Sequence, residues 1–462
     1  MGYHEYICQI CGVTFAIARI RTPQEPPSAA WDNHGTGSGM FVNSGVPDDD
    51  DFDDDSYFDD NIPGGNISGG CMIAVRPPRG HEGGDVPILS QHPDEEMYFE
   101  DMCGISKEDR AKILTRLRDV EAGYRLEHIA GPTCGAGDGY HGNKISYEEM
   151  RTCSTMQGLV TKPPSWKPED GDEEFERSGR YFLSGLIDRL TNVDNLYHEQ
   201  SYPKRHGCED IFPVTHYRDI AENFYNMDFY SIPLHPACLE TFKRATLRRY
   251  GSVDVGAFIQ WWEADGDEDS LIPRKDDKDV RSSRSQWWRH NEGSEYLAAN
   301  PCIVPNLEKA FLPMAPRTAG PEGHDEVFSS LPSEIRSSIF DHLSLEDISN
   351  LLLASPFLSR SSQDHLRRRL IREWPWLWEA WTKLEYSVWV GKTARDLRES
   401  ATPPGNQVVI SDTDAVNWGS VFRYISKQRS NDELKGLRNR ERIWKRCEVI
   451  LDKASQLPKN GD

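Results

Sequence analysis

Residues 325–378 read DEVFSSLPSEIRSSIFDHLSLEDISNLLLASPFLSRSSQDHLRRRLIREWPWLW. Ile335, Ile339 and Leu343 recur every four residues, which is the spacing of an apolar face on a helix. Pro332 suits the start of that helix, where its missing N–H is not needed. The stretch predicts three short helices in about 45 residues, near the lower size limit for a core that folds alone. We therefore expect some apolar surface to face a partner or the rest of the chain.

The boundaries of the second and third helices are also visible in this stretch. Ser344 and Asp347 form an S-x-x-D pattern that predicts a helix start, and Pro356 is expected to end that helix. A further start is predicted between Ser361 and Asp364, ahead of an apolar group that includes Leu366. All three predicted helices are short and apolar on one face.

The same helices carry a pattern that resembles the F-box family. The pattern has a leucine-proline-x-glutamate start followed by spaced apolar anchors: Leu331, Pro332, Glu334, Ile335, Ile339, Phe340, Leu343, Asp347, Ile348, Leu351 and Ala354. The resemblance covers residues 325–371. It weakens near its end, where F-boxes often carry valine-cysteine followed by tryptophan and this chain has Leu353-Ala354-Ser355-Pro356-Phe357.

The resemblance implies docking on the Skp adaptor of a cullin-containing, SCF-type ubiquitin ligase. The residues implied to seat in the adaptor are Leu331, Pro332, Ile335, Ile339, Leu343 and Ile348. The rest of the chain would hold an unknown protein substrate, and tethering would raise its effective concentration near the ubiquitin donor. The alternative is a zinc-stabilised interaction scaffold, in which the three helices are internal core and bind no adaptor.

Composition narrows the function classes. The chain has 462 residues and a net charge of -22, with 37% hydrophobic and 28% charged residues. This predicts about three domains with long loop or disordered parts. The negative charge argues against nucleic-acid binding, which needs a basic surface. No apolar run approaches the ~18 residues of a membrane span, and we expect a cytoplasmic or nuclear protein without a secretory signal.

The predicted fold class is α+β, with a zinc-stapled N-terminal domain that carries long inserts, followed by a helical F-box and a mostly helical C-terminal region. The predicted parts are a zinc-binding domain at 1–21 plus 68–262, a disordered acidic insert at 22–67, a connector at 263–324, the F-box at 325–371 and a helical, tryptophan-rich region at 372–462. The insert contains nine aspartates between Asp48 and Asp60, and such a run is usually solvated. Bulky aromatics such as Trp378 are expected mainly in the core.

Two separated pairs of residues predict a metal centre. Cys8 and Cys11 form a C-x-x-C followed by glycine, as in a zinc knuckle, and His235 and Cys238 form an H-x-x-C at a predicted helix start. Together they make a Cys3His set, which is a closed tetrahedral zinc site. The combination resembles a treble-clef or LIM-type zinc finger, although more than 200 residues separate the pairs here. The alternatives are a redox C-x-x-C, or a buried C-x-x-C with a separate capping histidine.

A second group, His128, Cys134, His141 and Cys153, has spacings that match no metal pattern. The adjoining loop Gly131–Gly142 is glycine-rich, but no G-K-[ST] follows, so it is not a phosphate loop. A substrate site at this loop would make the chain an enzyme, which is a third reading. Neither G-x-S-x-G nor H-E-x-x-H is present, and we expect a non-catalytic adaptor.

Overall fold

The computed structural model describes residues 6–31, 72–76, 86–90, 125–134, 139–187, 205–206, 212–213, 230–264, 292–311, 327–355, 357–358, 363–400, 407–410, 412–413, 415–430 and 433–458. The strands are β1 (Arg19–Ile20), β2 (Met72–Arg76), β3 (Val86–Ser90), β4 (Arg125–Ile129), β5 (Tyr140–His141), β6 (Met156–Thr161), β7 (Tyr181–Ile187), β8 (Phe212–Pro213) and β9 (Tyr230–Leu234). The helices are α2 (Tyr147–Met150), α3 (Glu174–Ser178), α5 (Pro236–Tyr250), α6 (Gly256–Ala264), α9 (Ser333–His342), α10 (Leu345–Ala354), α12 (Gln363–Glu373), α13 (Ala394–Glu399), α14 (Trp418–Ser430) and α15 (Lys435–Gln456). The 3-10 helices are η1 (Pro27–Ala29), η5 (Glu295–Ala298), η6 (Leu307–Phe311), η7 (Val327–Ser330) and η8 (Trp378–Ala380). The predicted α+β class is confirmed.

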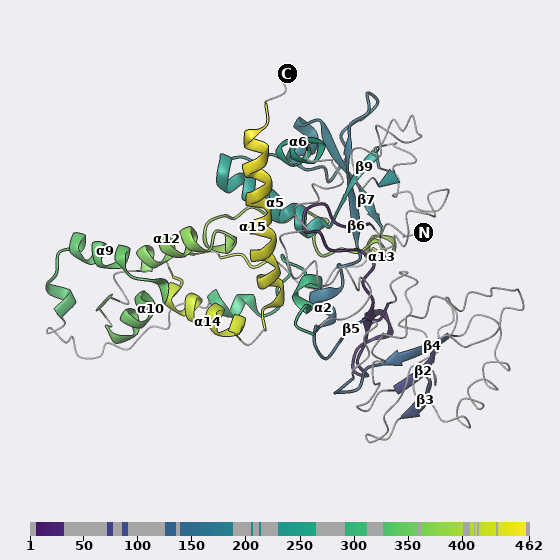
Figure 1. Ribbon diagram of the computed structural model, residues 1–462, viewed down its shortest axis with the longest axis horizontal. Coiled ribbons are helices and arrows are strands. Elements are labelled where there is room, and N and C mark those ends of the chain that lie inside the picture. Colours follow the sequence, from purple (N-terminus) through teal and green to yellow (C-terminus); the bar gives the residue numbers. More distant parts are fainter. Residues whose placement is uncertain are drawn as a thin grey trace, which may run out of the picture.

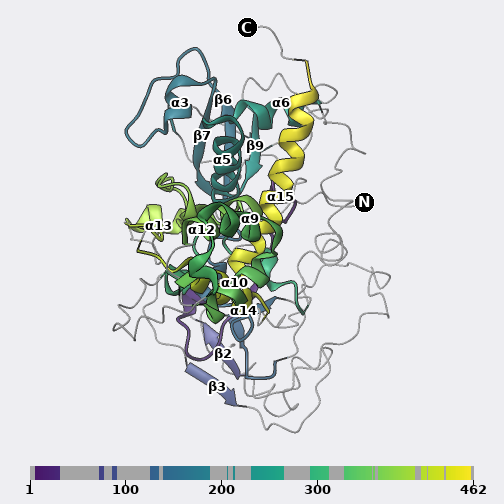
Figure 2. The same ribbon diagram turned by 90° about the vertical axis from the view of Figure 1, so that its left-hand side faces the viewer.

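The strands form small sheets. One has the order β7-β6-β9-β8, in which β6 pairs antiparallel with both β7 and β9. A three-stranded sheet has the order β3-β2-β4, and β1 pairs parallel with β5. Helix α5 follows β9 directly and lies against one side of the four-stranded sheet (Figures 1 and 2).

Helix α15 joins the C-terminal region to the N-terminal domain. It runs beside α5 and α6, and it also contacts η5 (Figure 1). Its inward side buries Leu437, Ile443, Trp444, Cys447 and Ile450, because these residues follow the helical period. Helix α15 therefore shares one core with the predicted zinc-binding domain. Within the described residues, no helix has both the length and the apolar character needed to cross a membrane.

The start of the predicted acidic insert belongs to the core. Trp31 is 8% exposed, its backbone exchanges hydrogen bonds with Arg19, and its Nε1 donates to the carbonyl of Ile17 at 2.7 Å. The prediction of disorder from residue 22 is therefore wrong for residues 22–31, since one tryptophan buries enough area to order the turn that carries it. Residues 32–67, with the aspartate run, lie outside the described residues.

The predicted connector at 263–324 also contains core. Its part from 292 to 311 buries Tyr296 and Leu297, and Asn439 of α15 donates its Nδ2 to the carbonyl of Ala299 at 2.7 Å. The mixed composition of this part suggested a linker, but its apolar side chains fill the space beside α15. The remaining parts of the predicted connector lie outside the described residues, apart from residues 263–264 at the end of α6.

The three helices predicted in 325–371 are present as α9, α10 and α12. Helix α14 packs against both α10 and α12, so the unit also draws a helix from the predicted C-terminal region. Its buried residues include Phe340, Ile348, Leu352, Leu366 and Leu370. We call α9, α10, α12 and α14 the helical arm, because it extends away from α15 and has α9 at its far end (Figure 1).

The tryptophan-rich segment is core, as predicted, but it is not a continuous helix. Helix α12 ends at Glu373 because Pro375 follows, and the chain then turns so that Trp376 and Trp378 are 2% and 1% exposed. Arg440 of α15 lies over the Trp378 ring, with Cζ 3.7 Å from the ring centroid, and pairs with both carboxylate oxygens of Glu379 at 3.0 and 2.9 Å. This segment therefore ties the arm to α15 through buried aromatic and ionic contacts.

We predict that Glu379→Ala lowers the free energy of unfolding by about 3–5 kcal/mol, because it leaves the fully buried Arg440 without its counter-charge. Urea unfolding followed by tryptophan fluorescence measures the change. The control is Glu399→Ala, which removes an exposed ion pair with Arg395 and is expected to cost less than about 0.5 kcal/mol. Equal effects of the two variants would contradict the prediction.

Candidate metal centre

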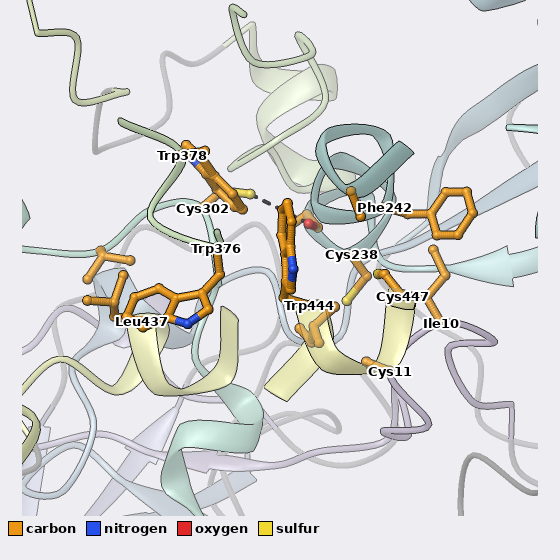
Figure 3. Packing of buried hydrophobic residues seen from close by; sticks show 14 of the residues in the cluster. Ile10, Cys11, Cys238, Phe242, Cys302, Trp376, Trp378, Leu437, Trp444 and Cys447 are labelled. Carbon is orange, nitrogen blue, oxygen red and sulfur yellow. Dashed lines mark hydrogen bonds between the residues drawn. The ribbon is translucent and has the colours of Figure 1, made fainter. Parts of the chain in front are cut away.

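The structure brings the two predicted ligand pairs together. The ligand atoms of Cys8, Cys11, His235 and Cys238 all lie within 4.8 Å of one another, and all four residues are buried. Cys11 and Cys238 lie in the same part of the core as Cys447 of α15 (Figure 3). The predicted pairing across the chain is therefore present, and this group can hold a metal ion.

The first pair sits on a tight turn. The Cys8 N–H donates to the carbonyl of Val13 at 2.9 Å, and the Gly12 N–H donates to the carbonyl of Cys8 at 2.8 Å. Gly12 has a φ of 74°, a left-handed conformation that glycine adopts without steric cost. The sequence order C-x-x-C-G thus produces the bend that turns both thiols to one side.

The second pair sits where β9 passes into α5. His235 is the N-cap residue, and Cys238 follows in the first turn of the helix. The two pairs are held together by backbone contacts: the Gln9 N–H donates to the carbonyl of Pro233 at 3.0 Å, and the His235 N–H points to Cys8 Sγ at 3.4 Å. The knuckle is therefore docked on β9, which fixes its distance from the helix start.

The imidazole of His235 is oriented for ligation. Its Nε2 lies 2.8 Å from the carbonyl of Cys153, and since a carbonyl can only accept, Nε2 carries a proton. The other nitrogen, Nδ1, lies 3.5 Å from Cys11 Sγ and 3.8 Å from Cys238 Sγ. Zinc bonds of about 2.3 Å to sulfur and about 2.0 Å to nitrogen place tetrahedral ligands about 3.6 Å apart. The carbonyl thus acts as the outer partner that orients a metal-binding histidine.

The electrostatics of the group favour a cation at its centre. Burial lowers the pKa of His235, but the sulfurs of Cys8 and Cys11 outweigh it and raise that pKa to about 10. Burial raises the pKa of the Cys11 thiol, but hydrogen bonds from the other cysteines and the charge on His235 bring it well below its usual value. Burial and the sulfurs of Cys11 and Cys8 raise the pKa of Cys238 well above its usual value. In the absence of metal, His235 and Cys238 therefore keep protons that a bound metal ion would displace.

Residues outside the ligand set contact the centre and stabilise its geometry. Arg442 of α15 donates its Nη1 to the carbonyl of Cys11 at 2.9 Å, and the Phe15 ring lies 4.4 Å from the His235 ring. Cys153 was expected beside His128, Cys134 and His141, but it belongs to this centre through its carbonyl. Burial raises the pKa of the Cys153 thiol to about 12, so that thiol stays neutral. No spacing pattern could have linked these residues to the ligands.

The second predicted group is brought together in part. His128 and His141 are each 3% exposed, and their Nε2 atoms lie 3.6 and 4.0 Å from Cys134 Sγ. Cys153 lies apart, at the first centre. The three residues come from β4, from the turn after it and from β5.

A buried acidic group that sequence analysis missed also satisfies the geometry for a metal. Asp172, Glu176 and His206 lie close together and are buried. Arg205 donates to both carboxylates, at 2.7 Å for Glu176, and the Leu183 N–H donates to Glu176 at 2.9 Å. Since the Arg205 guanidinium already pairs with both carboxylates, the group is an internal ion-pair network.

The implied adaptor-binding residues divide into two sets. Ile335 is 49% exposed, Pro332 is exposed, and Leu331, Ile339 and Leu343 are half-buried. Ile348 is completely buried in the helical arm, so its assignment to a partner contact is wrong for this structure. The reason is that α10 turns this residue toward α12 and α14, which form the interior of the arm.

We predict that Cys238→Ser lowers the bound metal, measured by elemental analysis, by about one ion per chain, because three donors bind far more weakly than a closed set of four. The control is Cys447→Ala, which removes a neighbouring buried thiol that is outside the ligand set and should leave the metal content unchanged. Unchanged metal in Cys238→Ser would contradict the assignment.

We also predict that zinc binding to the metal-stripped protein releases at least two protons at pH 7. His235, with a pKa of about 10, and Cys238, with a pKa raised well above its usual value, both hold protons that the metal must displace. Apparent affinity should therefore rise about 100-fold per pH unit near pH 7 and fall on acidification. Calorimetry in two buffers of different ionisation enthalpy counts the protons, and a release below two would contradict the prediction.

Comparisons with known proteins assign no family. No protein-family model, no curated protein and no solved structure matches this chain.

Proposed function

We propose that this chain is a non-catalytic F-box-type adaptor with a structural zinc centre. In this proposal, α9 docks on a Skp-type adaptor and through it on a cullin, while the rest of the chain holds a protein substrate for ubiquitin transfer. The observation that carries the proposal is the uncovered apolar side of α9 at the far end of the helical arm. The motif resemblance supplies the identity of the partner.

Helix α9 divides its apolar residues between two sides. Phe340 is 2% exposed and packs beside His365 of α12, with ring centroids 5.3 Å apart. Ile335, on the other side, is 49% exposed. A helix that served only the core of its own chain would bury both sets. The exposed side of α9 that carries Ile335 therefore indicates a surface that another molecule covers.

Exposed apolar residues also occur in the segments next to α9 in the sequence. Val327 in η7 is 74% exposed, and Leu353 at the end of α10 is 61% exposed. Both residues lie on the segments that flank α9 in the sequence, and the first precedes the leucine-proline start. The arm keeps its own interior through α10, α12 and α14, so this surface is available without unfolding the arm. That combination is what a docking module requires.

The zinc assignment follows from the donor set. Three thiols and one imidazole are ligands that zinc accepts and that magnesium and calcium do not favour. Four protein donors fill a tetrahedral site and leave no position for substrate, so the proposed role is structural. The centre links the N-terminal knuckle to β9 and α5, and it stabilises the part of the chain that would carry the substrate.

We predict that Ile335→Asp weakens binding to a Skp-type adaptor at least tenfold, because a charge then enters the apolar interface that the residue would occupy. Calorimetry with the purified adaptor measures the change. Ile339→Asp tests the same side one turn further along the helix. Both variants should keep the metal content of the wild type, since the centre lies in another part of the molecule (Figure 1).

The matched control is Val449→Asp, which places the same charge at a 44% exposed apolar residue of α15. It should bind the adaptor as the wild type does. If the wild-type chain does not bind the adaptor, the proposed function is wrong. The alternative, a zinc-stabilised interaction scaffold, then becomes the better interpretation of the chain.

A further inference from the structure

A cleft lies where the helical arm meets the rest of the molecule. It comprises about 460 Å³ of space, part of it open to solvent. Arg367 of α12, residues 379–383 and residues 407–410 line it together with Thr413. None of the four residues of the metal centre is among the lining residues, so the cleft is a separate feature. Its size is that of a pocket for a small ligand or for a few side chains of a peptide.

One side chain holds together the two chain segments beside the cleft. Gln407 Nε2 donates to the carbonyl of Leu384 at 2.8 Å, and the Tyr386 N–H donates to Gln407 Oε1 at 2.8 Å. A single amide therefore bonds to the backbone of the other segment as a neighbouring strand does. Gln407 fixes the two segments relative to each other before any ligand arrives, and such preorganisation favours binding.

The residues after Gln407 offer an unpaired backbone. Residues 408–410 contain no helical turn or bend, and Val409 is 60% exposed whereas Ile410 is 9% exposed, an alternation typical of an extended chain. Within the described part of the chain, the N–H and carbonyl groups of these three residues make no hydrogen bond. An extended backbone of this kind can pair with another extended chain, which then lies beside it as an added strand.

Arg367 supplies a fixed positive charge to the same cleft. Its Nε donates to the carbonyl of Ala380 at 3.0 Å, and its Cζ lies 5.6 Å from the centroid of the Trp418 ring. Among the described residues, its Nη1 and Nη2 atoms make no hydrogen bond and no ion pair. The carboxylate in the lining, Glu379, already pairs both oxygens with Arg440. The Arg367 guanidinium is therefore held in place with two nitrogens left for a carboxylate.

We propose that this cleft binds an extended, acidic segment of a partner protein. The backbone of that segment pairs with residues 408–410, one of its carboxylates binds Arg367, and an apolar side chain covers Val409. Lys383, which is exposed, lines the same cleft and adds positive charge. The net charge of -22 does not prevent this, because salt screens exposed charges beyond about 8 Å and the nearby cations dominate.

The cleft thereby gives a chemical class to the protein that the chain would hold. As the place that holds a ubiquitination substrate, it rests on the proposed adaptor function. As a site for an acidic peptide, it stands on the geometry of the cleft alone.

The main test uses the full-length chain and a short fluorescent peptide of alternating valine and glutamate, with fluorescence anisotropy as the measurement. The wild type should bind it about tenfold more tightly than the same peptide with glutamine in place of glutamate, because the carboxylate then meets the guanidinium. Arg367→Gln should remove this preference. Equal binding of the two peptides by the wild type would overturn the proposal, as would an unchanged preference in Arg367→Gln.

The matched control is Arg368→Gln, which removes the same charge from the next residue of α12. Arg368 is exposed and does not line the cleft, so this variant should bind the glutamate peptide within about twofold of the wild type. An equal loss in both variants would show general charge attraction only, and would also overturn the proposal.

A second measurement uses the unmutated chain and does not depend on folding of a variant. The glutamate peptide should slow amide hydrogen exchange in residues 407–410 about tenfold, because backbone groups that are unpaired in the free chain then make hydrogen bonds. Residues 327–330 of η7 are the internal control and should exchange at the same rate with and without peptide. Unchanged exchange in residues 407–410 would overturn the proposed strand pairing.

The Ile335→Asp variant separates this proposal from the proposed adaptor function. It should bind the glutamate peptide as the wild type does, because Ile335 does not line the cleft. Peptide binding by a wild-type chain that fails to bind the adaptor would support the cleft and refute only the adaptor function.

Discussion

The buried charges around Trp378 hold the separate parts of this chain in one body. Arg244 of α5 and Arg440 of α15 both lie over the Trp378 ring, at 5.0 and 3.7 Å from its centroid. Each guanidinium is fully buried and has its own carboxylate, Glu240 for the first and Glu379 for the second. An uncompensated buried charge is costly, so α15 and η8 must pack with the Arg440–Glu379 pair in place. Glu240 compensates Arg244 within α5 itself, and the Trp378 ring is the contact that joins α5 to this pair. The sheet domain, the tryptophan segment and the C-terminal helix therefore pack as a unit.

This constraint also explains why the metal centre tolerates its long insert. The entropy of closing a loop grows only with the logarithm of its length, so the distance in sequence between the two pairs adds little. The pairs are positioned by β9, by α5 and by Arg442 of α15, all of which are fixed by the core. A metal ion bound there would add its binding energy to a framework that packing has already shaped.

The helical arm is attached to the rest of the molecule at one end. Its interior is apolar, and it joins the body through α12 and the tryptophan segment that follows (Figure 1). It also joins the body through α14, which packs on η6, where the rings of Phe311 and Trp418 lie edge to face with centroids 6.2 Å apart. Arg367 of α12 donates its Nε to the carbonyl of Ala380 at 3.0 Å, and Trp374 stacks on Phe422 of α14 at 5.3 Å. These contacts anchor the near end of the arm, and at the other end Ile335 of α9 stays exposed. A projecting unit of this kind can bind a partner without disturbing the body.

The sequence by itself determined the features that depend on near neighbours: the helices of the arm, the knuckle turn at Gly12 and the H-x-x-C at the start of α5. These follow from residue spacing and backbone preferences, which act within a few positions. Only the tertiary structure decided that Ile348 faces inward while Ile335 faces outward, because the neighbours of a helix choose which apolar side is covered. It also ordered residues 22–31, drew residues 292–311 into the core and brought His128, Cys134 and His141 together. These outcomes depend on side-chain contacts and burial that follow no fixed spacing, so they leave no periodic trace in the chain.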